Sequence, residues 1–323
     1  MDISSSSLPS TVQLEITPCP LGCAPGDKKI LSGTDLLHDI PGEFTVVECQ
    51  SCNLMRTDPR PDAQSIGVYY PSDYGPYVGT VVYADKQADG FVRKLIRAAK
   101  RIFDTKANSI PSLAPGKMLE FGSASGNYLH AMASQGWQVE GIEYSEDAAS
   151  NARALGHIVH VGAIETITLP EQQFDLIAGW MVVEHLHDPV ASLQKLARWA
   201  KPDATLAISV PNAKSAEFRL FGKRWYALQL PTHLYHYTPE TLEKLLDRTG
   251  WTVTKIHHHR TVSNLVASLG YVLIDRGWSK AGTMLVNFPE RGGRLGALVL
   301  FPLSFIMAAL GQTGRMTVWA KRK

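Results

Sequence analysis

The stretch KMLEFGSASG, from Lys117 to Gly126, decides the fold of this chain. Its first half, Lys117–Phe121, is short and largely apolar, which predicts a buried strand. Its second half, Gly122–Gly126, contains only small residues. Such a run predicts a tight turn whose backbone can approach a ligand closely.

The residues after this turn extend the pattern to a helix and a second strand. The helix is expected over Asn127–Gln135, because its apolar residues share one face and Gly136 follows as a stop. The second strand is expected over Trp137–Ile142 and leads into Glu143. A strand, a tight turn, a helix, a second strand and an acid form the front half of a doubly wound α/β sheet that binds a nucleotide.

The turn does not carry the fingerprint of a dinucleotide site. That fingerprint needs glycine at the first, third and sixth turn positions, which here are Gly122, Ala124 and Asn127. The pattern Glu120-x-Gly122-x-Ala124-x-Gly126 instead resembles the first motif of class I S-adenosylmethionine (SAM) methyltransferases, whose usual form is acid-x-Gly-x-Gly-x-Gly. The resemblance implies a Rossmann-like, seven-stranded sheet and SAM as cofactor. A Rossmann-like fold without a ligand is the alternative.

The same resemblance assigns roles to residues at the ends of the expected strands. Glu143 would accept hydrogen bonds from both ribose hydroxyls, and Glu120 would accept near the ammonium group of SAM. The family usually reads adenine with an Asp two residues after the third strand, where this chain has Ala163, so we expect the backbone and Ile164 to hold adenine. The candidate cofactor-binding residues are Glu120, Gly122, Ala124, Gly126, Glu143, Tyr144, Ala163, Ile164, Trp180 and Tyr70.

Length and composition are those of an ordinary globular enzyme. The 323 residues suffice for one large domain and a small one, and apolar residues make up 45% and charged residues 19% of the chain. The net charge of +2 argues against a nucleic-acid partner. Residues 1–12 lack the basic and apolar regions of a secretory signal. We expect a disordered tail there and a cytoplasmic protein.

The four cysteines form two close pairs, Cys19-x3-Cys23 and Cys49-x2-Cys52. Four thiolates at this spacing suit a tetrahedral zinc ion, which predicts a zinc ribbon over residues 13–60. The zinc would be structural, since four protein ligands leave no position for a substrate. Four reduced thiols, or two disulfides in an exported protein, are the alternatives.

A tyrosine-rich segment and a basic amphipathic helix are expected over residues 61–110. The ribbon is followed by Pro-Arg-Pro and then by Tyr-Tyr-Pro-x-x-Tyr, which ends at Tyr74. This order resembles the methyltransferase branch that includes sugar C-methyltransferases and enzymes of polysaccharide and secondary-metabolite pathways. The resemblance implies that Tyr70 and Tyr74 cover the cofactor and substrate cleft; alternatively, the tyrosines pack the ribbon against the main domain. The helix is expected over Gly90–Thr105.

Residues 111–323 are expected to form the SAM-binding domain, with insertions at 211–237 and 258–314. Two helices are expected in the second insertion, near Val262–Arg276 and Arg294–Leu310. The last strand is expected to be antiparallel. The remaining strands are predicted at Ile158–Val161, Phe174–Gly179, Thr205–Val210, Trp251–His257 and Arg315–Ala320.

The apolar run at 295–311, LGALVLFPLSFIMAALG, is short for a membrane span and is interrupted by Pro302. A helix buried against the sheet, or a lid over the cleft, is the first interpretation. The second is that residues 294–311 contact a membrane surface or an apolar acceptor.

A histidine is the natural base for methyl transfer to oxygen or carbon, because the acceptor must lose a proton. His185 is the first candidate, since the family commonly places its base after the fourth strand, and Glu184 is expected to orient the imidazole. His233 and His236 are the second candidates, in a Pro-x-His-x-x-His insertion that resembles the family's substrate lid. Together with Tyr74 they are the candidate substrate-binding residues.

Two further expectations concern metals and surface histidines. Some quinone O-methyltransferases bind a divalent cation through acids that precede the Glu-His pair. Met181 stands where the first such acid would be, so we expect no catalytic metal. The three histidines at 257–259 are expected on the surface.

The leading hypothesis is a SAM-dependent methyltransferase that acts on oxygen or carbon of a small-molecule or sugar-type acceptor, including lipid- or nucleotide-linked ones. A ribosomal-RNA methyltransferase with a zinc ribbon is the second hypothesis. A non-catalytic SAM-binding protein is the third, motivated by Ala124 and Ala163. The sequence leaves the acceptor and the oligomeric state open.

Overall fold

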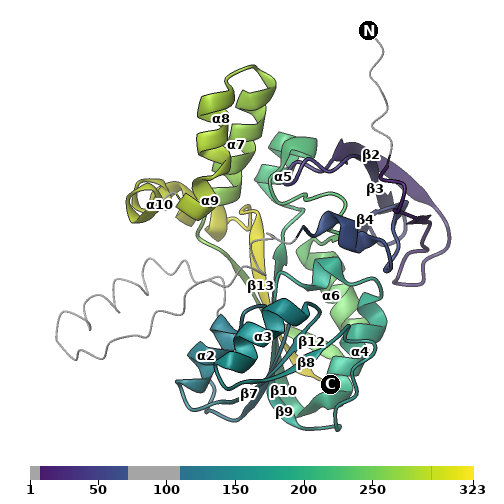
Figure 1. The fold of residues 1–323 in the computed structure, drawn as a ribbon, viewed down its shortest axis with the longest axis vertical. Helices are drawn as coiled ribbons and strands as arrows, with labels where there is room; N and C mark the ends of the chain where they lie inside the picture. Colours follow the sequence, from purple (N-terminus) through teal and green to yellow (C-terminus); the bar gives the residue numbers. More distant parts are fainter. Residues whose placement is uncertain (1–7, 72–109, 292) are drawn as a thin grey trace.

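The computed structural model describes residues 8–71, 110–291 and 293–323 (Figure 1). Tyr74 and the helix expected at Gly90–Thr105 lie outside these described residues. A seven-stranded sheet organises the main domain, with the order β12-β13-β10-β9-β6-β7-β8. Its strands are β6 (Lys117–Phe121), β7 (Gln138–Glu143), β8 (Ile158–Val161), β9 (Phe174–Trp180), β10 (Ala200–Pro211), β12 (Trp251–His258) and β13 (Arg315–Arg322).

The sheet has the Rossmann-like topology that the sequence predicts. The pairs β6–β7, β7–β8, β6–β9 and β9–β10 are parallel, whereas β13 runs antiparallel to both β10 and β12. The chain builds outward from β6 to β8 and then returns to β9 on the other side of β6. Strand order therefore reverses between β6 and β9, and ligands of open α/β sheets bind beyond the carboxyl ends of the strands at such a point.

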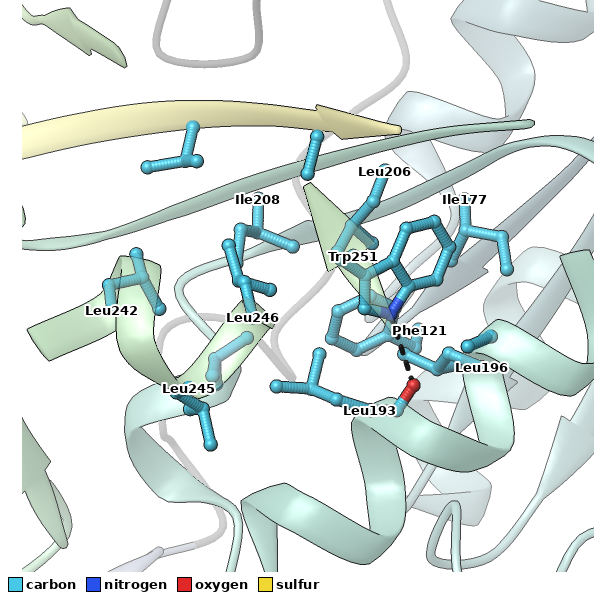
Figure 2. Close-up of a cluster of buried hydrophobic side chains, with 14 of the residues drawn as sticks. Phe121, Ile177, Leu193, Leu196, Leu206, Ile208, Leu242, Leu245, Leu246 and Trp251 are labelled. Atoms are coloured by element: carbon cyan, nitrogen blue, oxygen red, sulfur yellow. Dashed lines mark hydrogen bonds between the residues drawn. The ribbon is translucent and has the colours of Figure 1, made fainter. Parts of the chain in front are cut away.

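Helices cover both faces of this sheet. One face packs against α4 and α6 through a cluster that includes Phe121, Leu193, Leu246 and Trp251, whose indole Nε1 donates to the Leu193 carbonyl at 3.1 Å (Figure 2). The other face packs against α2 and α3. The helices are α2 (Asn127–Ala133), α3 (Glu146–Ala154), α4 (Pro189–Trp199) and α6 (Pro239–Arg248).

The starts of these helices follow from capping residues in the sequence. Ser145 accepts from the Ala148 amide at the start of α3, and Asp188 accepts from the Ala191 amide at the start of α4. Thr238 caps α6. Each side-chain oxygen satisfies a backbone donor that has no partner inside the helix.

A second sheet, β11-β4-β3-β2, is built mostly from the N-terminal region, and a small β1–β5 pair lies beside it in the chain. Strand β11, at one edge of the four-stranded sheet, comes instead from the insertion at 211–237. A shared apolar core that includes Phe44 and Trp225 joins the two segments. The N-terminal elements are β1 (Leu14–Glu15), β2 (Asp27–Thr34), β3 (Glu43–Cys49), β4 (Met55–Thr57), β5 (Arg60–Pro61) and η1 (Ile66–Tyr69). The insertion contains α5 (Ala216–Phe221), η3 (Gly222–Arg224) and β11 (Tyr235–His236), whereas η2 (Val183–His185) follows β9 in the main domain.

Three local predictions are wrong. The two helices expected in the insertion at 258–314 are present as α7 (Ser263–Asp275) and α10 (Gly293–Ala309). The expected number is wrong, because the described residues between them also form α8 (Ser279–Val286) and α9 (Phe288–Arg291). Residues 8–12 of the expected disordered tail form a turn, and Leu8 and Val12 pack against the second sheet's core. His259 is buried rather than on the surface, and its Nε2 lies 2.7 Å from the Thr317 hydroxyl.

Helix α10 lies apart from the seven-stranded sheet, beside α9 (Figure 1). Several large apolar side chains are exposed here, among them Val299 and Ile306 in α10 and Leu310 directly after it. Within the described residues, none of the helices combines the length and the apolar character needed to cross a bilayer.

Candidate active site

The turn after β6 adopts the left-handed backbone conformation that its small residues predict. The φ angles of Gly122, Ala124 and Gly126 are 67°, 46° and 80°. A Cβ atom on Gly122 would lie 2.4 Å from a methyl carbon of Val182, so this position has no room for a side chain. Ala124 replaces the middle glycine of the motif and accepts a left-handed conformation that costs an alanine about 1 kcal/mol.

Glu143 holds this turn in place. Its Oε2 accepts from the Ala124 amide at 2.8 Å, and its Oε1 accepts from the Ser145 amide at 2.9 Å. Each carboxylate oxygen can accept a second hydrogen bond, so both remain competent to bind a diol. The acid at the end of β7 therefore joins the turn to the start of α3 and stays available to a ribose.

Near the carboxyl end of β6, the buried polar atoms without a hydrogen-bond partner in the described part of the chain include Glu120 Oε2, Ser123 Oγ, Tyr128 OH and Trp180 Nε1. Burial raises the pKa of Glu120 well above its usual range, and the nearby charge of Glu143 adds to the rise. Unpartnered buried polar atoms are uncommon in folded proteins. An unpartnered carboxyl oxygen of Glu120 beside a turn of small residues fits the ammonium group of a SAM molecule.

The other candidate cofactor residues lie at the ends of neighbouring strands. Tyr144 is 69% exposed and follows β7 directly, whereas Ile164 is buried after β8. Ala163 follows Gly162, whose amide donates to the Glu143 carbonyl at 2.9 Å. Tyr144, Ala163 and Ile164 thus follow the carboxyl ends of β7 and β8, the two strands that continue the sheet from β6.

His185 lies in η2, the short turn that follows β9. Its Nδ1 is 2.8 Å from the Thr232 carbonyl and 2.9 Å from the Tyr70 hydroxyl. A carbonyl oxygen can only accept, so Nδ1 carries the proton and Nε2 keeps a lone pair. Burial lowers the pKa of His185 to about 4, which keeps the imidazole neutral near pH 7. Sequence reasoning placed Tyr70 against the cofactor and did not foresee its contact with His185.

Glu184 and His233 complete a compact group with His185. The two imidazole rings meet edge to face with centroids 4.7 Å apart, and the candidate ligand atoms of all three residues lie within 4.8 Å of one another. His233 Nδ1 lies 2.9 Å from the Ala227 carbonyl, so its Nε2 also keeps a lone pair. These imidazole nitrogens and the Glu184 carboxyl oxygen are atoms that can bind a cation, and the sequence did not predict that they would lie together.

Glu184 does not hold the His185 imidazole as expected. Its side chain is fully buried, and neither carboxyl oxygen has a hydrogen-bond partner within the described residues. Burial raises the pKa of Glu184 to about 8, so the group is protonated near pH 7. The Thr232 carbonyl orients the imidazole instead, and the sequence carries no signal for a backbone contact of this kind.

His236 lies outside this three-residue group. It is buried in β11, with Nε2 3.2 Å from the Thr57 hydroxyl, and burial lowers its pKa to about 3. The insertion thus contributes His233 to the group directly, whereas His236 belongs to the second sheet and contacts Thr57 on the neighbouring strand β4.

Arg315 is a neighbour of the group that sequence reasoning missed. It begins β13 opposite Pro211, at the carboxyl end of β10, and its charge acts on Glu184 and Glu217. No carboxylate oxygen of the described residues lies within the 4.0 Å ion-pair distance of its guanidinium. An antiparallel strand begins at the edge of the sheet where the parallel strands end, which is the edge where ligands bind. Because the last strand was predicted to be antiparallel, its first residue, Arg315, could have been predicted to lie near the site.

The four cysteines form a separate cluster whose Sγ atoms lie within 4.8 Å of one another. Cys19 Sγ and Cys52 Sγ are 3.5 Å apart. This separation is far longer than the S–S bond of about 2.05 Å in a disulfide. It is close to the edge of about 3.8 Å in a tetrahedron with Zn–S bonds of about 2.3 Å. The four thiols therefore fit a structural zinc ion.

Comparisons with known proteins concern mainly the seven-stranded sheet. The family model described as a methyltransferase domain matches residues 86–256, just over half of the 323-residue chain. The ubiquinone biosynthesis O-methyltransferase of Nitrobacter winogradskyi is 29% identical over 204 residues, which cover 59% of this chain and 74% of that protein. The enzyme of the same name from Rhodopseudomonas palustris (strain BisB5) is 28% identical over 170 residues, 49% and 67% of the two chains. An S-adenosylmethionine dependent methyltransferase structure from Mesorhizobium loti matches with a TM-score of 0.44 and 15% identity, covering 70% of this chain and 96% of that one.

Proposed function

We propose an acceptor for this chain, which belongs to the methyltransferase-domain family and is a SAM-dependent methyltransferase. It methylates an oxygen or carbon atom of a small-molecule or sugar-type acceptor. The observation that carries this proposal is the state of His185. Its Nδ1–H is held by the Thr232 carbonyl, its pKa is about 4, and its Nε2 lone pair is free to take a proton.

The residues of the turn would hold SAM, which supplies an electrophilic methyl group on a positively charged sulfur. Glu143 would bind the ribose hydroxyls with the second lone pair of each oxygen, and Glu120 would accept from the ammonium group. Binding a cation beside Glu120 lowers its pKa, so the carboxyl group becomes charged when the ligand arrives.

The His185 group would act on the acceptor. His185 Nε2 takes the proton from the attacking hydroxyl or carbon acid, and the Thr232 carbonyl stabilises the imidazolium through Nδ1–H. A protonated Glu184 can donate a hydrogen bond to an acceptor oxygen, and His233 Nε2 can accept one. Much of the remaining rate enhancement would come from alignment of acceptor and methyl group in a partly dry site.

The acceptor is proposed to be polar, with oxygen atoms next to the reacting position. The two relatives are named as O-methyltransferases, which supports transfer to oxygen. Arg315 supports an acceptor with an anionic or electron-rich group, because its guanidinium has no ion pair with a carboxylate of the described residues. The exposed apolar side chains of α10 support a membrane-surface contact by residues 294–311, which would suit a lipid-linked acceptor.

The cysteine cluster is proposed to bind one structural zinc ion. The proposed organisation has a ribbon at 13–60, a connecting segment at 61–110 and a catalytic domain at 111–323. The zinc ion would stabilise the ribbon through four thiolates, with no open position for the acceptor.

Transfer of a radioactive methyl group from SAM tests the proposed activity. Purified protein is incubated with a catechol carboxylate, with a nucleotide-linked keto sugar and, separately, with total ribosomal RNA. We expect label in a small-molecule product and none in RNA. Labelled RNA would favour the ribosomal-RNA alternative. Tight binding of S-adenosylhomocysteine without transfer to any acceptor, including a small-molecule cell extract, would favour a non-catalytic SAM-binding protein.

A further inference from the structure

The N-terminal sheet reaches directly into the segment that carries the site histidines. Strand β4 pairs antiparallel with β11, so that Arg56 lies opposite Tyr235 and Met55 opposite His236. The Thr57 amide extends this ladder by donating to the Leu234 carbonyl at 2.9 Å. Strand β4, near the end of the expected zinc ribbon, therefore pairs directly with residues 234–236.

The Thr57 hydroxyl makes two further contacts with the same segment. Its Oγ1 lies 2.7 Å from the His233 carbonyl and 3.2 Å from His236 Nε2, and the residue is fully buried. The carbonyl can only accept, so it takes the single hydroxyl proton. Oγ1 must then accept from His236, which fixes the His236 proton on Nε2.

Short backbone links carry this arrangement to the proposed base. The Leu234 amide donates to the Glu184 carbonyl at 2.8 Å, and the Thr232 carbonyl holds His185 Nδ1 at 2.8 Å. Thr57 thus donates to two consecutive backbone carbonyls, those of His233 and Leu234, while the Leu234 amide and the Thr232 carbonyl hold η2. The turn that would bind SAM follows β6, is held by Glu143 at the end of β7, and takes no part in these contacts.

We propose that Thr57 is a positioning residue for the acceptor half of the active site. Its hydroxyl and amide fix the path of residues 232–236, and through them the orientations of His185 and His233. It touches neither the acceptor nor SAM. The catalytic roles of the two histidines rest on the proposed function, whereas the tautomer of His236 and the path of the segment do not.

A matched pair of variants separates the hydroxyl from the volume of the side chain. Thr57→Val keeps the branched shape and removes the hydroxyl, and Thr57→Ser keeps the hydroxyl and removes a methyl group. In Thr57→Val the His233 carbonyl and the His236 N–H both lose a buried partner. We expect kcat to fall at least tenfold in Thr57→Val and to stay within threefold of wild type in Thr57→Ser. The KM for SAM and the dissociation constant of S-adenosylhomocysteine should stay within twofold in both.

NMR of protein labelled with 15N-histidine provides a readout independent of turnover. The wild-type His236 signal should show the proton on Nε2, and Thr57→Val should change the signals of His236, His233 and His185 while Thr57→Ser preserves them. A wild-type His236 protonated on Nδ1 would overturn the proposal even if Thr57→Val fails to fold. Unchanged kcat and unchanged imidazole signals in a folded Thr57→Val would overturn it as well. Failure of the wild type to methylate any acceptor would count against the proposed function and would leave the NMR outcome decisive for Thr57.

Discussion

The Nδ1 atom of His185 lies 2.8 Å from the backbone carbonyl oxygen of Thr232, a contact that joins the turn after β9 to the insertion at 211–237. The contact selects one tautomer and directs the Nε2 lone pair away from that carbonyl. The protein thereby prepares a neutral imidazole with a backbone partner in place of the carboxylate that sequence reasoning expected.

Replacing His185 by glutamine should abolish methyl transfer and leave cofactor binding nearly intact. The variant removes the proposed base, which contributes about 10²–10⁴-fold to a reaction that requires proton transfer. Turnover is measured with labelled SAM, and the affinity for S-adenosylhomocysteine is measured by calorimetry. The affinity should stay within a few-fold of wild type.

His38→Gln is a matched control, because it makes the same substitution in the N-terminal sheet region and should keep full turnover. A His185→Gln protein that no longer binds S-adenosylhomocysteine would instead place His185 in the cofactor site.

The stability of the protein should depend on the protonation of Glu217. This residue is 1% exposed and accepts from the Gly314 amide at 3.0 Å. Burial raises its pKa from the ordinary 4.5 to about 7. Because the pKa of Glu217 is higher in the folded state, the folded state holds this proton more tightly than the unfolded state. The contribution of the protonated Glu217 to the free energy of unfolding is therefore complete below pH 4.5 and is lost as the pH rises through 7. The loss amounts to about 3 kcal/mol.

Chemical denaturation of wild type and Glu217→Gln between pH 5 and pH 8 measures this dependence. Glutamine keeps an oxygen for the Gly314 amide and has no proton to lose, so the stability of wild type should decline relative to that of the variant as the pH rises. Parallel stability curves over this range would show that Glu217 titrates normally.

One zinc ion per chain is expected from elemental analysis of purified protein. Cys52→Ser should lose the zinc and lower the melting temperature, because a site with three thiolates binds the metal less tightly. Ser51→Ala changes the exposed neighbour of Cys52 and should retain both metal and stability. Disulfide-linked peptides from this region in a non-reducing digest would contradict the zinc assignment.

Helix α10 should mediate association with anionic vesicles. Val299 and Leu310 are 71% and 68% exposed, and Ile306 is 57% exposed. A variant with serine at these three positions should remain at the bottom of a flotation gradient, whereas wild type should rise with phosphatidylglycerol vesicles. Wild type that stays at the bottom would remove the membrane contact, and circular dichroism would verify that the variant is folded.

The parts of the fold with local signals could be predicted from the sequence. Strand β6, the turn to Gly126, α2 and β7 have apolar patterns and turn residues within about 30 consecutive positions, as a βαβ unit does. The caps Ser145, Asp188 and Thr238 likewise act on amides within their own helices. Local chemistry sets these elements, so local patterns reveal them.

Contacts between distant segments could not be predicted from local sequence patterns. Thr57 and His236 are 179 positions apart, and the hydroxyl contact between them depends on strand pairing across two regions of the chain. The burial of His259 depends on β13, and the contact of Tyr70 with His185 spans 115 positions. Residue types pointed to the acceptor half of the site, but only the tertiary arrangement shows which side chains meet.

A crystal structure with S-adenosylhomocysteine tests the central claim most directly. The account predicts that the ligand lies along the turn at Gly122–Gly126, with its ribose hydroxyls on the Glu143 carboxylate, its amino group near Glu120 and its sulfur facing the His185 side. Ligand density at any other place, or a turn that remains closed by side chains in the presence of saturating ligand, would contradict it.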